Sequence, residues 1–324
     1  MKILVIRLGA IGDVVLTSAA LRTLRAAQPD AEIHYLVKQH FAFLLAECPY
    51  INRLHTYDPK AGSRQLLKTL RSEHFDFVVD LQRSLRTVMW RMLLCRPSSA
   101  LHKCNLQKSL VTSPLHLHAA VPHVALRYIE ACAPLHAKDD GLGLELFMKP
   151  ASPPLFAEPY VALVFGAAHC TKRITPEGVS QLCSHLSCRV VIVGDQGDAA
   201  TLAASGVALP PNADNRCGTC SFEESAAIVS HAAVVVSSDT GLMHVAAAAR
   251  RPVVAVWGST SPLLGFAPFR TQHTDVQVGS LRCHPCGKLG FDRCPKHHFR
   301  CMAGHDWQRI ACIVESLITK HNET

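Results

Sequence analysis

Aromatic and charged residues are both scarce in this chain of 324 residues. Phe, Trp and Tyr make up 6% of the residues and Asp, Glu, Lys and Arg 18%, whereas 48% are apolar. The low charge content excludes a disordered polyelectrolyte, and the length is sufficient for a core that needs no disulfides. At roughly 100–200 residues per domain, we expect two domains.

Long apolar runs are also lacking. No stretch approaches the roughly 18 uncharged apolar residues of a membrane-spanning helix. The apolar run that follows Met1 is cut by Arg7, and it lacks the length and cleavage site of a signal peptide. We therefore expect a cytoplasmic protein that can touch a membrane surface, where a reducing environment keeps most of its 14 cysteines as thiols.

The positive charge that is present is concentrated in one half of the chain. Residues 1–150 contain 19 Lys and Arg against 12 Asp and Glu, a net charge of +7. Residues 151–324 contain 14 against 13, a net charge of +1. This asymmetry indicates either an anionic partner for the first half or a basic face that only meets solvent.

Short apolar segments alternate with helix-like segments, which predicts parallel sheets covered by helices. The predicted strands are Lys2–Leu8, Ala31–Val37, Phe75–Leu81, Tyr160–Phe165, Arg189–Val193, Ala233–Ser237 and Pro252–Trp257. The predicted helices are Asp13–Ala27, Phe41–Cys48, Ser63–Ser72, Gly241–Ala249 and 306–319, with others that begin at Thr175 and Ser221. A proline-rich stretch between Phe147 and Pro159 predicts two doubly wound α/β domains, 1–150 and 151–324, with a ligand cleft between them.

The first candidate motif lies between the first predicted strand and helix. Gly9 and Gly12 allow a tight turn there, and free amides at a helix start favour an anion. The G-x-x-G-D spacing is a poor match to the dinucleotide-binding fingerprint. Asp13 either caps the helix or, at the carboxyl end of a strand, accepts a proton from a substrate hydroxyl.

A second candidate motif follows the first strand of the second half. Small residues that begin at Gly166 precede the paired cations Lys172 and Arg173, and a helix begins soon after. Cations next to a helix start are suited to a phosphate. The alternative is an ordinary loop whose cations face water.

A third candidate motif runs from a strand end into a helix of small residues. The backbone amides of Thr240 and Gly241, with the threonine hydroxyl, are placed to meet a phosphate. His244 follows Thr240 by four residues and so lies on the same helical face. Two such motifs in one half predict that the second domain binds a diphosphate.

Several of these segments resemble glycosyltransferase family 9, the ADP-heptose:lipopolysaccharide heptosyltransferases. The most specific are Arg7–Thr17 (RLGAIGDVVLT), Asp239–Ala248 (DTGLMHVAAA) and Pro252–Thr260 (PVVAVWGST). Asp80–Arg83 with Arg86–Thr87, and Gly166–Ala167 with Lys172–Arg173, match in order, so the resemblance covers nearly the whole chain.

This resemblance implies a GT-B fold, with an N-terminal acceptor domain and a C-terminal nucleotide-sugar domain. It implies inverting, metal-independent transfer of a heptose, or a related sugar, from ADP-heptose to a lipopolysaccharide core. No cofactor would be required. The enzyme would be cytoplasmic and peripheral to the inner membrane of a Gram-negative-type bacterium, where its basic half meets an anionic glycolipid.

The resemblance also implies roles for individual residues. Asp13 matches the general base, and Lys172 matches the cation that neutralises the leaving diphosphate. The implied nucleotide-sugar site consists of Gly166, Lys172, Arg173, Asp198, Cys220, Ser221, Asp239, Thr240, Gly241 and His244. Asp198 occupies the position of the ribose-binding acid, which in the family is usually glutamate. The implied acceptor site consists of Gly9, Gly12, Arg83 and Arg86.

A cysteine cluster near the end of the chain has no part in that chemistry. Its members are Cys283, Cys286, Cys294 and Cys301. Their spacing is compatible with a structural zinc site of four thiolates, and equally with free thiols or a redox-sensitive pair. Cys217 and Cys220 form a second C-x-x-C, which we interpret as incidental.

Two other functions compete with glycosyl transfer. A GT-B sugar-nucleotide epimerase or hydrolase would need no acceptor half, and Arg83 and Arg86 disfavour it. A zinc-containing nucleic-acid-binding protein would interleave basic and aromatic residues, and aromatics are only 6% of this chain. Neither the exact sugar nor the oligomeric state is indicated by any motif.

Overall fold

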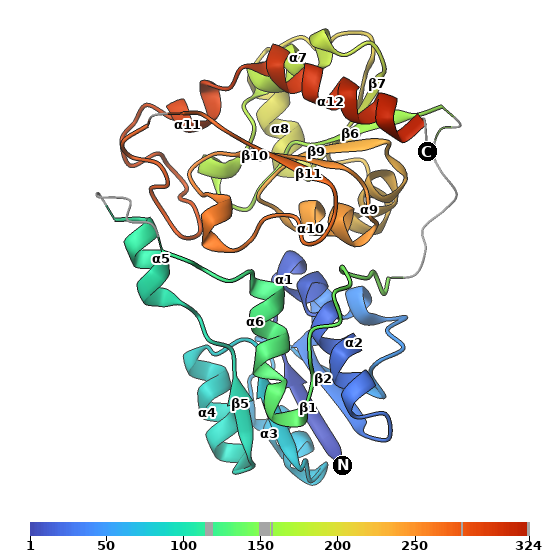
Figure 1. Cartoon of the computed structure of the whole chain (residues 1–324), viewed down its shortest axis with the longest axis vertical. Helices are drawn as coiled ribbons and strands as arrows, with labels where there is room; N and C mark the ends of the chain where they lie inside the picture. The colour runs from blue at the N-terminus through green and yellow to red at the C-terminus, as the bar shows by residue number, and fades with distance from the viewer. Residues whose placement is uncertain (114–118, 149–155, 157, 280, 323–324) are drawn as a thin grey trace. The chain divides into compact units, whose positions relative to one another are not determined.

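The chain forms two compact units in the computed structural model (Figure 1). The first unit comprises Met1–Lys103 and Pro122–Lys149, and the second comprises Cys104–Val121 and Pro150–Thr324. The structure describes residues 1–113, 119–148, 156, 158–279 and 281–322. Most of the proline-rich stretch that we expected to join the domains lies outside these ranges.

One segment differs from the predicted division. Helix α5 (Asn105–Val111), expected in the first domain, belongs to the second unit. The Lys288 ammonium donates to the Asn105 carbonyl at 3.2 Å and to the Ser109 hydroxyl at 2.7 Å. The Lys108 ammonium lies 4.7 Å from the centre of the Phe266 ring. These contacts join residues far apart in the sequence, so local patterns gave no sign of them.

The first unit is built on a parallel sheet. Within the described residues its strands lie in the order β3-β2-β1-β4-β5. Their bounds are β1 Lys2–Ile6, β2 Glu32–Lys38, β3 Arg53–Tyr57, β4 Phe77–Asp80 and β5 Ser98–Ala100. The helices are α1 Ile11–Leu16, α2 Ser18–Ala27, α3 Arg64–Ser72, α4 Leu85–Leu94 and α6 Val124–Ala131, with 3₁₀ turns η1 Gln39–Leu45 and η2 Ala133–Leu135.

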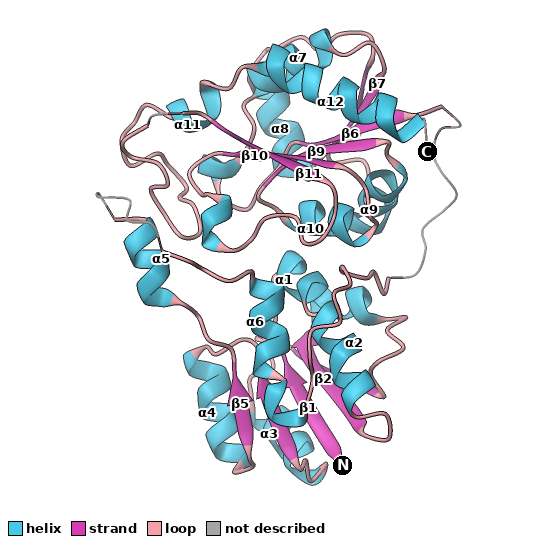
Figure 2. Ribbon diagram, viewed as in Figure 1, coloured by secondary structure: helices cyan, strands magenta, loops and turns pink. Residues whose placement is uncertain are grey.

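Helices cover both faces of this sheet (Figure 2). Helices α3 and α4 bury Leu70, Trp90 and Leu94 against Leu4 and Ile6 of β1. Because side chains alternate along a strand, the β1 residues next to Leu4 and Ile6 point to the other face of the sheet. On that face α2 and α6 pack on each other. This two-sided burial explains why β1 is apolar from Ile3 to Ile6.

The first predicted helix is divided in two. α1 ends at Leu16 and α2 begins at Ser18, with Thr17 at the join. The Thr17 hydroxyl donates to the Val14 carbonyl at 2.7 Å and lies 3.1 Å from the Tyr35 hydroxyl. A threonine that bonds back to its own helix competes with the helical ladder, so the helix breaks there. The segment expected as helix Phe41–Cys48 is instead the 3₁₀ turn η1.

The second unit repeats the architecture. Within the described residues its strands lie in the order β11-β10-β9-β6-β7-β8, all parallel. Their bounds are β6 Tyr160–Val164, β7 Arg189–Val193, β8 Ala213–Asn215, β9 Val234–Ser238, β10 Val253–Trp257 and β11 His273–Gln277. The helices are α7 Pro176–His185, α8 Gln196–Ala204, α9 Phe222–His231, α10 Gly241–Ala248, α11 Arg300–Ala303 and α12 Trp307–Asn322, with 3₁₀ turns η3 Cys170–Lys172 and η4 Pro262–Leu264.

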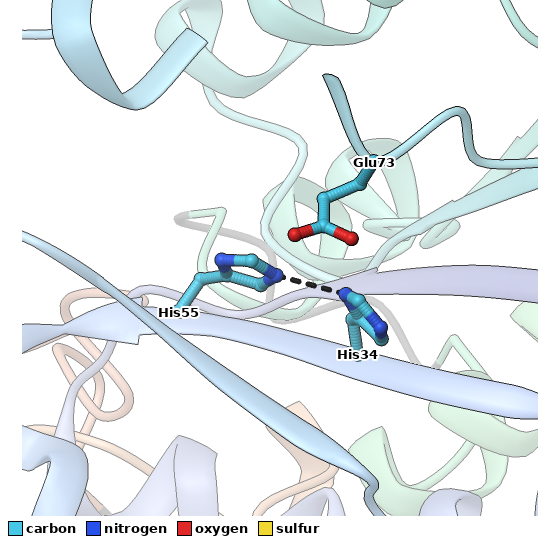
Figure 3. Close-up of side chains that lie close together, drawn as sticks. All are labelled: His34, His55 and Glu73. Carbon is cyan, nitrogen blue, oxygen red and sulfur yellow. Dashed lines mark hydrogen bonds between the residues drawn. The ribbon is translucent and has the colours of Figure 1, made fainter. Parts of the chain in front are cut away.

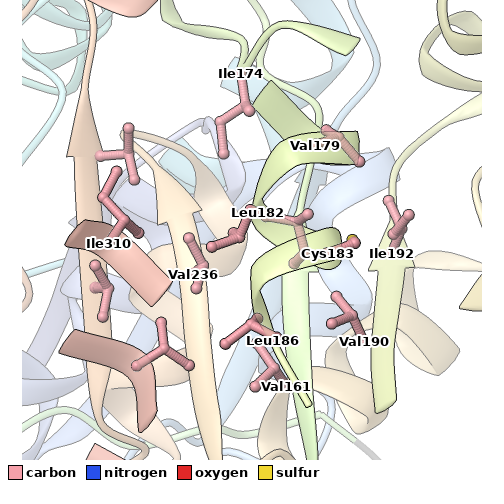
Figure 4. Close-up of a cluster of buried hydrophobic side chains, with 14 of the residues drawn as sticks. Val161, Ile174, Val179, Leu182, Cys183, Leu186, Val190, Ile192, Val236 and Ile310 are labelled. Atoms are coloured by element: carbon pink, nitrogen blue, oxygen red, sulfur yellow. The ribbon is translucent and has the colours of Figure 1, made fainter. Parts of the chain in front are cut away.

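The core of the second unit lies between this sheet and the helices α7 and α12. Leu182 and Leu186 of α7 and Ile310 of α12 pack on strand residues such as Val161 and Val236 (Figure 4). Such a core holds the carboxyl ends of the strands in fixed positions, and the loops that follow them carry the candidate motifs. No helix in the described ranges is long and apolar enough to span a bilayer.

Candidate active site

The second and third motifs meet because their strands are neighbours. β6 and β9 pair in parallel, so the loops that leave their carboxyl ends emerge side by side. The Lys172 ammonium lies 2.7 Å from Oδ2 of Asp239 and donates to the Asp239 carbonyl at 3.3 Å. Thr260, after β10, donates to the same Oδ2 at 3.0 Å. The Lys172 and Asp239 side chains are each 14% exposed, so solvent reaches this ion pair.

The N-terminus of α10 adjoins this ion pair. Thr240 is the N-cap, but its side chain accepts no hydrogen bond from the first turn of the helix. The first amides of a helix have no partner within it, so they remain available to an anion. His244, one turn further on, is 3% exposed. The structure therefore places a cation beside an uncapped helix start.

Gly166 and Arg173 lie next to Asp198. A Cβ at Gly166 would overlap the Asp198 carboxylate, so this position needs glycine. Asp198 is 3% exposed, and its Oδ2 accepts from the Asp195 amide at 2.9 Å in the capping box of α8. Burial raises the pKa of the Asp198 carboxyl, against the opposing effects of the Asp195 amide and Arg173. Arg173 Nε lies 3.7 Å from Oδ1 of Asp198 and donates to the Ala167 carbonyl at 2.8 Å.

Cys220 and Ser221 lie at the start of α9. The Ser221 hydroxyl accepts from the Glu224 amide at 3.1 Å, and the Ser221 amide donates to the Glu224 carboxylate at 2.7 Å. This is the capping box that the sequence predicted. Ser221 is exposed and Cys220 half-buried, so both side chains can contact a ligand.

In the first unit, Asp13 is held by two side chains. Its Oδ2 forms an ion pair with Arg7 and accepts from the Ala10 amide at 3.3 Å. Its Oδ1 accepts from the Tyr128 hydroxyl at 3.1 Å. Burial raises the pKa of the Tyr128 phenol well above its ordinary value, so the phenol remains a donor. Sequence reasoning missed Tyr128, because its helix α6 was not predicted and no motif surrounds it.

The glycine loop before Asp13 depends on a close approach. Gly9 has a φ of +145°, and a Cβ there would overlap the Phe41 ring. Gly12 is buried in the first turn of α1. The Leu8 amide donates to Gln82 Oε1 at 3.1 Å, which ties this loop to the turn after β4. Residues predicted for the acceptor site therefore lie along one edge of the first sheet.

Arg83 and Arg86 lie in that turn and at the start of α4. The buried Asp80 carboxylate accepts from the Arg83 amide at 2.7 Å and shapes the turn. Arg83 Nη1 donates to the Leu101 carbonyl at 3.1 Å, and the Arg86 guanidinium lies 5.3 Å from the centre of the Tyr57 ring. Both residues remain exposed, so their charges are accessible.

Comparison with known proteins decides the family. The model of glycosyltransferase family 9 (heptosyltransferase) matches residues 63–290. The chain belongs to this family. It is 25% identical to lipopolysaccharide heptosyltransferase 3 of Escherichia coli K12 over 293 residues, which cover 77% of this chain and 80% of the relative.

Solved structures show the same fold. A family 9 glycosyltransferase from Veillonella parvula superposes with a TM-score of 0.78 and 18% identity, over 98% of this chain and 97% of that one. The ADP-heptose lipopolysaccharide heptosyltransferase II of E. coli gives a TM-score of 0.72 and 22% identity, over 99% of this chain and 100% of that one. The two Rossmann-like units are those of a GT-B glycosyltransferase, as the sequence predicted.

In this glycosyltransferase the cysteine-bearing loop supports Lys172. The Thr171 amide donates to the Phe291 carbonyl at 3.0 Å, and the Phe291 amide donates to the Thr171 hydroxyl at 2.8 Å. The Thr171 hydroxyl also lies 2.8 Å from that of Ser259. A Cβ at Gly290 would crowd the Lys172 side chain. The loop therefore fixes the backbone from which Lys172 extends.

The four cysteines of that loop are free thiols in different surroundings. Burial raises the pKa of the Cys301 thiol to about 12. Burial would also raise the pKa of the Cys294 thiol, but hydrogen bonds from the backbone amides of 296–299 outweigh it and lower that pKa. Cys283 Sγ lies 3.4 Å from His298 Nε2. Within the described ranges no three of these potential ligands lie within 4.8 Å of one another, so the zinc site remains a prediction without geometric support.

One other group in the described chain does meet that distance: His34, His55 and Glu73 (Figure 3). His34 Nδ1 lies 2.8 Å from His55 Nε2, and His34 Nε2 lies 2.7 Å from the Glu32 carboxylate. Glu73 pairs with Lys2 at 3.1 Å and with Arg53 at 2.6 Å. The group could hold a metal ion, but both ring nitrogens of His34 and the Glu73 carboxylate already have partners. Its residues come from the amino half of β2, from β3 and from the end of α3.

Proposed function

We propose that this family 9 glycosyltransferase transfers a heptose from ADP-heptose to a lipopolysaccharide core acceptor, with inversion at the anomeric carbon. The observation that carries the donor assignment is the solvent-accessible Lys172 beside the uncapped start of α10. Support for the sugar and the acceptor comes from the relatives, which are named for ADP-heptose and lipopolysaccharide.

In this mechanism the diphosphate of the donor competes with Asp239 for Lys172. The ammonium would move from the carboxylate to the phosphate oxygens, while Thr260 continues to donate to Asp239. The amides of Thr240 and Gly241 would bind the second phosphate. As the glycosidic bond breaks, Lys172 neutralises charge that develops on the leaving diphosphate, which is a transition-state interaction.

Asp13 acts on the other substrate. Its carboxylate would accept the proton of the acceptor hydroxyl as that oxygen attacks the anomeric carbon. Arg7 and Tyr128 orient the carboxylate, and Arg83 and Arg86 would bind the anionic groups of the acceptor. Neither arginine forms an ion pair with a carboxylate among the described contacts, so both charges can meet an anionic acceptor.

Two of the remaining predicted residues would line the nucleoside. Cys220 and Ser221, both accessible, would contact the adenine. Asp198 is buried under Gly166, so we expect it to hold the Arg173 loop rather than reach the ribose.

Nucleotide selectivity tests the donor assignment. We expect ADP to raise the melting temperature in a thermal-shift screen more than UDP, GDP or CMP, because a ligand stabilises the state that binds it. By calorimetry, Lys172→Gln should weaken ADP binding about tenfold to hundredfold, because a charged hydrogen bond is lost and Asp239 then faces the phosphates unopposed. Lys296→Gln is the matched control, since Lys296 is an exposed lysine of the same unit.

The transfer itself is tested with ADP-heptose and a core acceptor. Acceptor-dependent ADP release and a glycosylated product support the proposal. ADP release that is equal without acceptor would make the enzyme a hydrolase. An unchanged ADP affinity in Lys172→Gln would contradict the role of Lys172.

A further inference from the structure

Helix α4 carries apolar side chains on two opposite sides. Thr87, Trp90 and Leu94 are buried against the first sheet. Four large side chains on the other side are exposed: Leu85 (93%), Met89 (49%), Met92 (72%) and Leu93 (41%). Their spacing of three and four residues places them along one stripe of the helix.

This exposure is concentrated in one place. Nine large apolar side chains are exposed in the described part of the chain, and four of them lie on this ten-residue helix. A helix that is apolar on all sides is normally buried, and a contiguous exposed apolar patch marks an interaction surface. The four exposed side chains are not part of the core of the unit, so packing of the core does not explain why they are apolar.

Cations surround the stripe. Arg86 and Arg91 lie on either side of it on α4, and the neighbouring α3 presents Arg64, Lys68 and Arg71 at helical spacing. Neither helix contains an Asp or a Glu. The nearby Glu73 is already paired with Lys2 and Arg53, so it does not neutralise these cations.

Two hollows lie along the basic row, and one of them reaches the apolar stripe at Leu93. One, of about 560 Å³, runs along α3 and is lined by Arg64, Lys68 and Arg71. The other, of about 260 Å³, lies where α3 meets the end of α4, and Arg71, His74, Arg96 and Leu93 contribute to its lining. Arg71 lines both, and its guanidinium donates to the Leu93 carbonyl at 3.2 Å. Cations around a hollow beside exposed apolar groups are suited to a phosphate that is joined to a hydrocarbon chain.

We propose that this α4 face, defined as the exposed stripe with the cations of α3 and Arg96, docks on a bilayer that contains anionic phospholipid. The apolar stripe enters the boundary of the acyl chains, and the cations bind lipid phosphates. The proposal rests on the proposed function only in that a lipid-linked acceptor would be met at such a surface. A second copy of the chain is disfavoured, because a twofold contact would place this carboxylate-free basic surface on itself.

Vesicle sedimentation tests the proposal without donor or acceptor. Wild-type protein should sediment with phosphatidylethanolamine vesicles that contain phosphatidylglycerol, and should remain in solution with phosphatidylcholine vesicles. Salt should weaken the binding, because surface charges are screened. The double variant Met92→Glu/Leu93→Glu should bind at least about tenfold more weakly, since two apolar side chains that would enter the bilayer become charged. Lys68→Gln should weaken binding about fivefold.

Leu142→Glu is the matched control, because Leu142 is 52% exposed in the same unit but lies outside the α4 face. It should bind vesicles as wild type does. Melting curves and ADP calorimetry of the double variant should be unchanged, which separates this proposal from the donor assignment. Equal sedimentation of the double variant and wild type would overturn the proposal. A second result would also overturn it: light scattering shows that wild type is a dimer and the double variant a monomer, and neither protein binds vesicles.

Discussion

Asp13→Asn tests whether Asp13 accepts the proton, with little change in the shape of the side chain. Asparagine has the shape of aspartate and keeps an oxygen that can accept from the Tyr128 hydroxyl, now 3.1 Å from Oδ1. It loses the charge and the ability to take up a proton. A positioned general base contributes about 10²–10⁴-fold to a rate, so we expect the kcat of transfer to fall by that factor. This corresponds to about 3–5 kcal/mol of activation free energy.

The same substitution also affects stability, for a reason visible in the structure. Arg7 is 8% exposed, and Asp13 is its charged partner. Removing one partner from a fully buried ion pair costs about 3–5 kcal/mol. The cost here should be smaller, about 1–3 kcal/mol, because the Asp13 side chain is 23% exposed and Arg7 still donates to the Leu81 carbonyl at 2.8 Å. Rates must therefore be normalised to the folded fraction.

The assay is the initial rate of ADP release with saturating donor and acceptor, next to circular dichroism at the same temperature. ADP affinity should not change, because Lys172 and the start of α10 belong to the second unit. Tyr128→Phe is the control: it removes one hydrogen bond to Asp13 but keeps the carboxylate, so kcat should fall less than about tenfold. Near-normal transfer by folded Asp13→Asn would refute the assignment of the base.

Three further predictions concern stability. Burial, and next the neighbouring His34, lower the pKa of His55 from 6.5 to about 4, so the unfolded chain takes up a proton first as pH falls. The free energy of unfolding, measured with urea, should therefore drop by about 2 kcal/mol between pH 7 and pH 5. His55→Gln should remove this pH dependence. Gly166→Ala should lower the melting temperature and weaken ADP binding, because the new Cβ overlaps the Asp198 carboxylate; wild-type values in both measurements would contradict that packing. Trp90→Ala should destabilise the first unit by about 3–5 kcal/mol, whereas Met92→Glu, on the exposed side of the same helix, should leave its unfolding curve unchanged.

Much of the fold follows from local patterns. The strands that begin and end near Lys2–Leu8, Tyr160–Phe165 and Pro252–Trp257 are found within two residues of their predicted bounds. Apolar runs bounded by turn residues are sufficient for this, because a strand covered on both faces must be apolar throughout. The helix broken at Thr17 was predicted as continuous, because a single back-bonding hydroxyl leaves the apolar period unchanged.

The candidate site was predictable in part. Lys172 and Asp239 were expected to share a ligand because each follows a strand, and loops at the carboxyl ends of parallel strands emerge at one edge. Their contact at 2.7 Å also required β6 and β9 to be neighbours, although three predicted elements separate these two strands in the chain. Sequence order does not determine strand order, so this pairing could not be derived.

The amino-acid sequence by itself determined the family, the alternation of strands and helices, and the positions of the cations and of Asp13, because these depend on residue type and local spacing. The tertiary structure alone decided that Tyr128 holds Asp13, that α5 belongs to the second unit, and that Asp198 is buried under Gly166. It alone also showed that one apolar side of α4 faces the core and the other faces outward. Such facts depend on contacts between distant residues, and hydrophobic periodicity records that a side chain is apolar but not which partner covers it.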